Sequence, residues 1–280
     1  MTPVGAPASQ RPARRPARER VPGEGLVPGR GPWYAAGGDD GEPDGDAPLI
    51  GVLALQGDVL EHLRVLEAAG ARAVPVKRAD QLDELDGIII PGGESTTIGK
   101  LADMYGLLDP LRKLLASGLP AYGTCAGAIL LGRTALGDDG LPSSQPLLGC
   151  MDVVVRRNAF GRQVDSFEAD LDVPGLEGGP VRAVFIRAPW IESVGDAVEV
   201  LGAVTPVSRD GVPLGAKVVL ARQGNMLASA FHPELTADHR VHLLFLDMVR
   251  ARRAAAVGAA PRTYVPPGPH RGPSARNVGP

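Results

Sequence analysis

This 280-residue chain has few cysteines, few aromatic residues and no long hydrophobic run, and each scarcity excludes a class of protein. Two cysteines cannot build a disulfide scaffold and favour a reducing compartment, so we expect a cytoplasmic protein. Aromatic residues make up 4% of the chain, which argues against stacking platforms for single-stranded nucleic acid. The net charge of -3 provides no general attraction for nucleic acid or anionic membranes. No apolar run approaches the roughly 18 residues that a membrane-spanning helix needs.

Proline, glycine and charged residues dominate both ends of the chain. Residues 1–48 are basic at their start and acidic at their end, and residues 256–280 are again rich in Pro, Gly and Arg. Because such segments have little apolar surface to bury, we expect both to be disordered. The basic start also lacks the apolar core of a secretory signal. The folded unit is therefore predicted over residues 49–255.

Inside that unit, short apolar runs alternate with helical patterns. The first half contains predicted strands at 49–55, 74–76 and 87–90 and predicted helices at 58–69, 95–105 and 107–117. This alternation is typical of a parallel sheet with helices on both faces. The second half has strands at 153–155, 183–186, 199–204, 218–220 and 226–230, then a helix over 237–253. We interpret these strands as antiparallel additions or sheet extensions, so the predicted class is α/β with a mostly parallel central sheet.

The motif Gly123-Thr124-Cys125-Ala126-Gly127 stands between a predicted strand and a predicted helix. Glycines two residues before and two after a nucleophile allow the sharp turn of a nucleophile elbow. A thiol placed there sits at a helix N-terminus, which favours the reactive thiolate. For this motif alone, a buried cysteine in a tightly packed turn is an equally good interpretation.

A second motif, Phe231-His232-Pro233-Glu234, follows the predicted strand 226–230. Because side chains alternate in an extended chain, His232 and Glu234 should point the same way. A carboxylate in that position can fix the tautomer of an imidazole that takes a proton from a thiol. A lone His-x-Glu is more often a surface feature, but with Cys125 it completes a nucleophile, base and orienter pattern.

Several polar residues fall where predicted strands end, which is where open α/β sheets bind ligands. They include Gln56, Cys125 and His232. The pair Gly92-Gly93 exposes backbone N–H groups, and one of them, with the N–H of Ala126, could form an oxyanion hole. The alternative is a glycine pair that serves only the turn.

Nucleotide and metal sites find little support in the sequence. The Gly92-Gly93 turn lacks the Gly-Lys-Ser/Thr ending of a P-loop, and no G-x-G-x-x-G follows the first predicted strand. The five histidines do not cluster and the two cysteines lie far apart, so no metal is expected. His239 and His242 are interpreted as part of the solvated face of the last helix.

Together these motifs resemble class I, or triad, glutamine amidotransferase domains. The matching segments are Leu55-Gln56-Gly57-Asp58-Val59 with Glu61-His62, Pro91-Gly92-Gly93-Glu94-Ser95-Thr96-Thr97, and the Cys125 elbow. A narrower resemblance is to the glutaminase subunits of pyridoxal 5′-phosphate synthase. It rests on residues 157–163, 166–168, 185–189 and 231–236, and the whole resemblance spans about 50 to 250.

The resemblance implies a flavodoxin-like class I amidotransferase fold and the hydrolysis of L-glutamine to L-glutamate and ammonia, without a cofactor. It implies that Cys125 is the nucleophile, His232 the base and then acid, and Glu234 the orienter of His232. The ammonia would pass to a separate, barrel-shaped synthase subunit that builds the vitamin B6 cofactor. The implied partners therefore include this subunit and no nucleic acid or membrane.

The resemblance also implies which residues contact glutamine. They are Gly93, Glu94, Ser95, Arg157, Ile186 and Arg187. Backbone N–H groups near Gly93 and Ala126 would hold the oxyanion, and Gln56 would link partner docking to activation. An arginine is suited to the α-carboxylate of the substrate, since its guanidinium can bind a carboxylate through two hydrogen bonds.

Three other functions stay open: an amidotransferase subunit that serves another acceptor, a non-enzymatic regulatory protein with the same fold, and a cysteine hydrolase that acts on something other than glutamine. The segments around Asn158 and Ile186 argue against the first, and the intact triad argues against the second. Residues 137–147 and 208–216 look longer than the family pattern. Cys150 matches no family role, and we expect it to be buried and inert.

Overall fold

The computed structural model describes residues 46–159, 166–206, 213 and 215–259. Of the two segments predicted to be disordered, only residues 46–48 and 256–259 are among the described residues. Residues 160–163, which belong to the family-like segment, and most of residues 208–216 also lie outside the described residues. All described residues belong to one compact unit. Among them, no helix is both long and apolar enough to cross a membrane.

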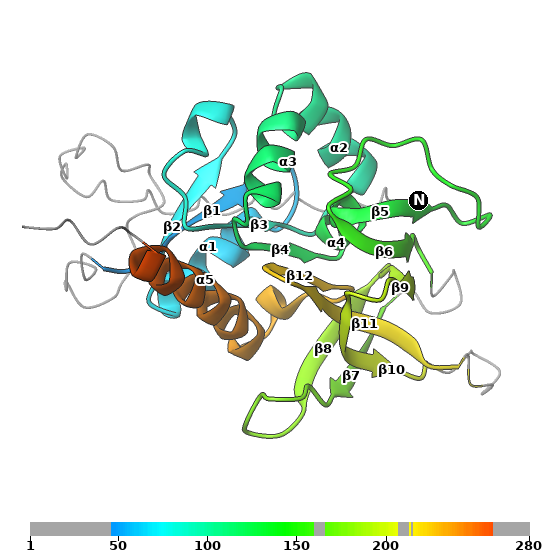
Figure 1. Cartoon of the computed structure of the whole chain (residues 1–280). Helices are drawn as coiled ribbons and strands as arrows, with labels where there is room; N and C mark the ends of the chain where they lie inside the picture. The colour runs from blue at the N-terminus through cyan, green and yellow to red at the C-terminus, as the bar shows by residue number, and fades with distance from the viewer. Residues whose placement is uncertain (1–45, 160–165, 207–212, 214, 260–280) are drawn as a thin grey trace, which may run out of the picture. The chain divides into compact units, whose positions relative to one another are not determined.

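Strands and helices alternate in the first half of this unit, as predicted (Figure 1). In chain order they are β1 (Leu49–Leu53), α1 (Val59–Ala68), β2 (Arg72–Val76), the 3₁₀ turn η1 (Ala79–Gln81), β3 (Gly87–Ile90), α2 (Ser95–Met104), α3 (Leu108–Ala116), β4 (Ala121–Thr124) and α4 (Ala126–Leu131). The second half contains β5 (Gly132–Leu136), β6 (Met151–Arg156), β7 (Ser166–Leu171), β8 (Val181–Ile186), β9 (Trp190–Val194), β10 (Glu199–Val204), β11 (Lys217–Gln223), β12 (Met226–Ser229), the 3₁₀ turn η2 (Pro233–Leu235) and α5 (Arg240–Ala259).

The main sheet has the strand order β2-β1-β3-β4-β12-β11-β9-β6-β5, and β10 pairs with β11. β2 lies at the edge, as expected for a strand that contains Pro75. We predicted residues 226–230 to be one of the antiparallel additions or sheet extensions. This prediction is wrong for one side of the strand, because β12 pairs in parallel with β4. Only its other side, which pairs with β11, is antiparallel. An apolar run indicates a buried strand but carries no information about its neighbour, so the sequence pattern missed this central position.

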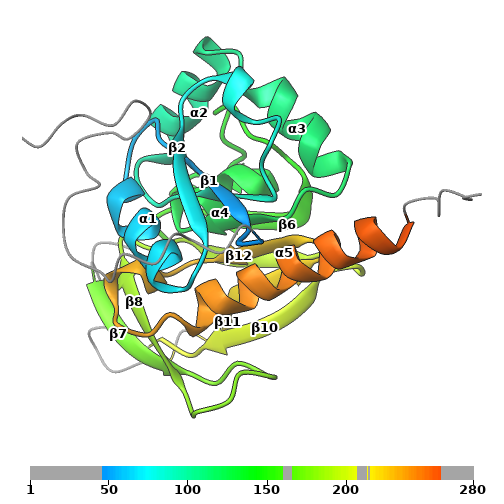
Figure 2. The ribbon, with the colours of Figure 1, turned by 90° about the vertical axis from the view of Figure 1, so that its left-hand side faces the viewer.

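Two hydrophobic cores lie on the two faces of the sheet. The alternation of strand side chains divides them: Ile50 and Val52 face the core that contains α1 and α5, and Leu53 faces the core that contains α2, α3 and α4. Figures 1 and 2 show α5 on the opposite side of the sheet from α2 and α3. The parallel strands are therefore covered by helices on both faces, which holds their carboxyl ends at one edge.

The sequence pattern missed three strands and misjudged one helix. β5, β7 and β9 have few buried positions, so they show no clear apolar alternation. The last helix begins at Arg240 and continues through Ala259, into the predicted C-terminal tail. The alanines at its end favour helix, and no proline follows until Pro261. On this helix His242 is fully buried, so placing it on a solvated face was wrong.

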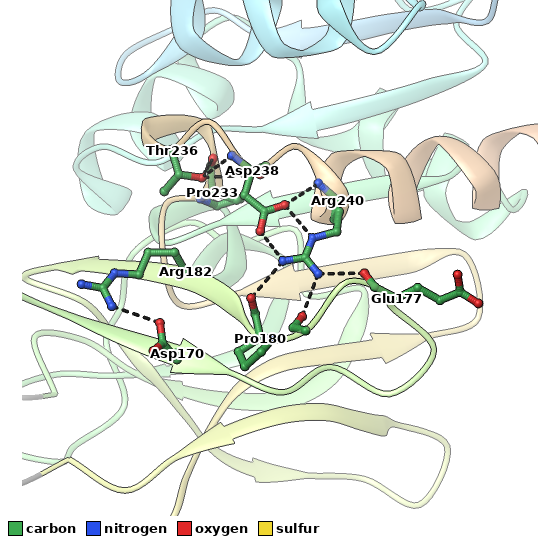
Figure 3. A network of polar contacts seen from close by, with 9 residues as sticks. Asp170, Glu177, Pro180, Arg182, Pro233, Thr236, Asp238 and Arg240 are labelled. Carbon is green, nitrogen blue, oxygen red and sulfur yellow. Dashed lines mark hydrogen bonds and ion pairs between the residues drawn. The ribbon is translucent and has the colours of Figure 1, made fainter.

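A polar network fixes the start of α5 to the loop before β8 (Figure 3). The guanidinium of Arg240 donates to the backbone carbonyls of Glu177, Gly179 and Pro180 at 2.7–2.9 Å. It also pairs with the Asp238 carboxylate at 2.6 Å. Because Asp238 closely follows η2, this network holds in place the segment that carries the His-x-Glu motif.

Candidate active site

The Cys125 elbow forms as the glycines predict. Cys125 has a positive φ of 47° between β4 and α4, and its N–H donates to the carbonyl of Ser229 in β12 at 2.8 Å. A Cβ on Gly127 would lie 1.9 Å from the carbonyl oxygen of Ile90, so only glycine fits this close approach of α4 to β3. The turn thus lifts the thiol to the N-terminus of α4, at the carboxyl edge of the sheet.

The His232 imidazole and the Glu234 carboxylate meet, but not through the extended geometry that the sequence suggested. β12 ends at Ser229, and His232 caps the 3₁₀ turn η2 with φ -110° and ψ 83°. Within this turn Glu234 Oε1 lies 2.7 Å from His232 Nδ1. The N–H of His232 also donates to the carbonyl of Val184 at 2.9 Å, which ties the turn to β8. The contact was predicted correctly, and the local backbone was not.

Three groups surround the imidazole of His232 and control its charge. Burial alone would lower its pKa, but hydrogen bonds with Asp58, Cys125 and Glu234 raise the pKa to about 12. Burial raises the pKa of Glu234, whereas the hydrogen bond to His232 lowers the pKa of Asp58. The arrangement therefore favours the imidazolium form of His232, with the side chains of Asp58 and Glu234 beside it.

Asp58 is a site residue to which the sequence reading gave no role. Its Oδ2 atom lies 3.4 Å from His232 Nδ1, and the side chain, a third of which is exposed, lines the cavity. The signal was present, because Asp58 belongs to the polar turn after the first strand. A carboxylate beside a histidine distant in sequence cannot, however, be recognised without the fold.

A cavity of about 500 Å³ opens at this edge of the sheet. Every predicted site residue lines it except Glu234, which lies behind His232. Those residues are Gln56, Gly93, Glu94, Ser95, Cys125, Ala126, Arg157, Ile186, Arg187 and His232. The cavity size is in the usual range for small-molecule sites.

One wall of the cavity carries both a positive and a negative charge. Glu94 caps α2 by accepting from the N–H groups of Thr96 and Thr97, and it also accepts from Arg157 Nη2 at 3.0 Å. Burial acts to raise the pKa of Glu94, but the hydrogen bonds from Thr96 and Thr97 hold it below its ordinary value. Ser95 lines the cavity, but its hydroxyl is buried and donates to Gln145 Oε1 at 3.2 Å.

The loops after β1 and β3 are packed tightly together beside the thiol. Gln56 Oε1 accepts from the N–H of Glu94 at 2.7 Å, and Asp58 N–H donates to the carbonyl of Gly92 at 3.3 Å. A Cβ on Gly93, whose φ is 147°, would lie 2.6 Å from Gln56 Oε1. The side chain of Gln56 thus helps to set the backbone of the predicted oxyanion loop.

Among the described residues, Cys125, Asn158 and Arg187 are the non-glycine residues with positive φ, and all three line the cavity. Such backbone conformations cost about 1–3 kcal/mol each and persist where surrounding structure enforces them. Their concentration around one cavity marks it as the functional site.

Asp58, His232 and Glu234 also form the group of described residues that could hold a metal ion, with ligand atoms within 4.8 Å of one another. The shared atom on the imidazole is Nδ1, which already contacts both carboxylates. A metal ion bound there would displace the hydrogen bond between His232 and Glu234. The donor set therefore fits a proton-transfer site better than a metal site.

Comparison with known proteins identifies the family. The model of the SNO glutamine amidotransferase family matches residues 52–251. The chain belongs to this family. The match covers both the Cys125 elbow and the His232-x-Glu234 turn, so the resemblance drawn from the motifs is confirmed.

Family members of known name and structure are closely similar to the chain. It is 59% identical over 204 residues to the pyridoxal 5′-phosphate synthase subunit PdxT of Frankia alni, covering 73% of this chain and 96% of that protein. The corresponding protein of Streptomyces coelicolor is 58% identical over 210 residues, covering 75% and 98%. A crystal structure of a glutamine amidotransferase is 48% identical, with a TM-score of 0.63, and covers 72% of this chain and 98% of its own. The predicted α/β fold is therefore confirmed.

Proposed function

We propose that this chain is a glutaminase that releases ammonia from L-glutamine and passes it to a pyridoxal 5′-phosphate synthase subunit. The observation that carries the proposal is the position of Cys125 and His232 in the wall of one cavity, with Glu234 Oε1 2.7 Å from His232 Nδ1 and the other predicted residues around them. The relatives that are named as pyridoxal 5′-phosphate synthase subunits support the choice of acceptor. Its two free thiols suit a reducing compartment, so we place the activity in the cytoplasm.

The charges of the cavity fit the two ends of glutamine. Arg157 binds the α-carboxylate and Glu94 the α-ammonium group, so the substrate replaces part of the ion pair between them. The side-chain amide then extends toward Cys125, past Ile186 and Arg187. Because the hydroxyl of Ser95 is already bonded to Gln145, Ser95 contacts the substrate through its backbone.

The reaction proceeds in two steps through a thioester. The Cys125 thiolate attacks the side-chain amide carbon, and the N–H groups of Gly93 and Ala126 stabilise the resulting oxyanion. The imidazolium of His232 gives its proton to the leaving nitrogen, so that ammonia departs. His232 then takes a proton from water, which attacks the thioester and releases glutamate and the thiolate. Glu234 holds the ring of His232 throughout.

Replacing Asp58 by Asn should move the alkaline limb of the pH profile of kcat/KM to lower pH. The Asp58 carboxylate is one of the groups that raise the pKa of His232, so its neutral isostere lets the imidazolium lose its proton earlier. The measurement is the initial rate of glutamate release between pH 6 and about 11. The unchanged chain, with a His232 pKa of about 12, should show no alkaline limb in this range, whereas Asp58→Asn should show one. Asp83→Asn, which neutralises an exposed carboxylate outside the cavity, is the matched control and should behave like the unchanged chain. The absence of an alkaline limb in Asp58→Asn would contradict this role.

Adding the synthase subunit should raise glutaminase activity at least about tenfold over the isolated chain. Gln56 sets the position of the loop that carries Gly93, and it lies exposed at the mouth of the cavity, where a docked partner can act on it. The experiment co-purifies the full chain with the synthase subunit and compares glutamate release with and without that subunit. Equal rates would argue against the coupling, and failure to co-purify would argue against the partner.

A further inference from the structure

A row of buried polar side chains lies behind Glu234, and these side chains have no role in the two-step reaction described above. It consists of His62 in α1, Thr124 at the end of β4 and His242 in α5, each with 0% of its surface exposed. Buried imidazoles are costly unless they are hydrogen-bonded. Three elements far apart in the sequence bring these groups together directly beneath the triad.

The contacts of His62 run in two directions. Its Nε2 atom lies 3.1 Å from Thr124 Oγ1 and 3.6 Å from Glu234 Oε1, the oxygen that accepts from His232. Its Nδ1 atom lies 3.0 Å from His242 Nε2. The row therefore leads from α5 through His62 to the carboxylate that orients the general base.

The protons on this row can be assigned from hydrogen bonding. Burial lowers the pKa of His242 to about 3 and that of His62 well below its ordinary value, so both rings are neutral. His242 Nδ1 has no partner among the described residues. Because an unpaired buried N–H is rarer than an unpaired acceptor, His242 carries its proton on Nε2 and donates to His62 Nδ1. The proton of His62 then sits on Nε2, facing Thr124 and Glu234.

The Glu234 carboxylate is 5% exposed, so water does little to stabilise its charge. The His62 N–H faces its Oε1 atom, the oxygen that is bonded to His232, whereas Oε2 has no hydrogen-bond partner among the described residues. The titratable neighbours of Glu234 are His232 and Asp58 on the cavity side, and His62 and Tyr122 on the interior side. Asp58 repels a negative charge on Glu234, so His62 is the interior group that can stabilise that charge.

We propose that His62 is a positioning residue whose Nε2–H, oriented by His242 and Thr124, keeps the Glu234 carboxylate ionised and directed at His232. His62 touches neither substrate nor thiol, and it acts only through Glu234. The inference builds on the proposed function, because it assigns His62 to the same triad. An ionised Glu234 stabilises the imidazolium and, through it, the Cys125 thiolate.

The test compares His62→Gln with His62→Asn by the pH dependence of Cys125 alkylation by iodoacetamide, which requires no glutamine. The Gln amide nitrogen can take the place of Nε2 and face Glu234, whereas the shorter Asn amide reaches only the place of Nδ1. Without the N–H, Glu234 ionises at higher pH, so the thiolate also forms at higher pH. We expect His62→Asn to raise the midpoint of the alkylation profile by about one pH unit, so that alkylation below the midpoint is about tenfold slower. His62→Gln should have the same profile as the unchanged chain.

Two further measurements keep the test decisive. Leu63→Ala, which removes packing from the same helix, should lower thermal stability without moving the alkylation midpoint. With the synthase subunit present, kcat for glutamine should fall about tenfold in His62→Asn while KM stays unchanged. Equal alkylation profiles for Gln and Asn would overturn the role of His62. If the Gln–Asn contrast appears but the unchanged chain hydrolyses no glutamine, the proposed function fails and the role of His62 stands.

Discussion

Replacing Cys125 by Ala should lower glutamate release by at least about a thousandfold while the chain stays folded. The thiol forms the covalent intermediate, so the remaining cavity can bind glutamine but has no nucleophile to attack the amide. Alanine fits the space, and it tolerates the positive φ of this position no worse than cysteine does. The measurement is single-turnover glutamate release with the synthase subunit present, alongside thermal unfolding of both chains.

Cys150→Ala is the matched control for this result. Cys150 is only partly buried, so the expectation of a buried residue was wrong. Its thiol contacts the carbonyl of Leu148, and partial burial raises its pKa, so it is a poor nucleophile away from the cavity. Its replacement should leave the rate unchanged within a factor of about two. Turnover by Cys125→Ala at a rate close to that of the unchanged chain would exclude the thiol mechanism.

Replacing Gly127 by Ala should lower the free energy of unfolding by about 2–3 kcal/mol and also reduce activity. The added Cβ would lie 1.9 Å from the carbonyl oxygen of Ile90, and the backbone of both residues is packed in the core, so neither side can yield easily. α4 must therefore move away from β3, and the Cys125 N-cap moves with it. The higher helix propensity of alanine, up to about 1 kcal/mol, recovers only part of this loss.

Denaturant unfolding measures this change, with Gly137→Ala as the control. A Cβ on Gly137 would lie 3.0 Å from Asp139 Oδ1 and at an ordinary contact distance of 3.7 Å from the Leu141 carbonyl. The Asp139 side chain is exposed and can shift by the small amount needed while it still accepts from the N–H of Leu141. The control should therefore change stability by less than about 0.5 kcal/mol. A Gly127→Ala chain as stable and as active as the control would show that the elbow does not depend on this close approach.

The residues that could be predicted from the sequence are those whose chemistry follows from local spacing. Glycines on both sides of Cys125 specify a turn by themselves, and a histidine two residues before a glutamate brings the two side chains within reach. The alternation of apolar runs and helical patterns likewise predicted the parallel half of the sheet. In each case the decisive interactions are between residues close in the chain.

What the sequence did not reveal depends on contacts between distant segments. Asp58 meets His232 only because β1 and β12 end at the same edge of the sheet. His242 looked like part of a solvated helix face, yet it lies buried against His62, 180 residues away in the chain. The 3₁₀ turn at His232 is held by Val184 and by the Arg240 network. Local sequence patterns do not predict these contacts, because they join segments that are far apart in the chain. Composition cannot separate a buried imidazole from an exposed one when its partner comes from another element.

The most direct test of the thiol mechanism is mass spectrometry after treatment with a glutamine analogue that carries an electrophilic ketone in place of the side-chain amide. The triad geometry predicts one covalent adduct on the peptide that contains Cys125, and excess glutamine should prevent it. An adduct on Cys150, or no adduct from a chain that still hydrolyses glutamine, would contradict the assignment of Cys125 as the nucleophile.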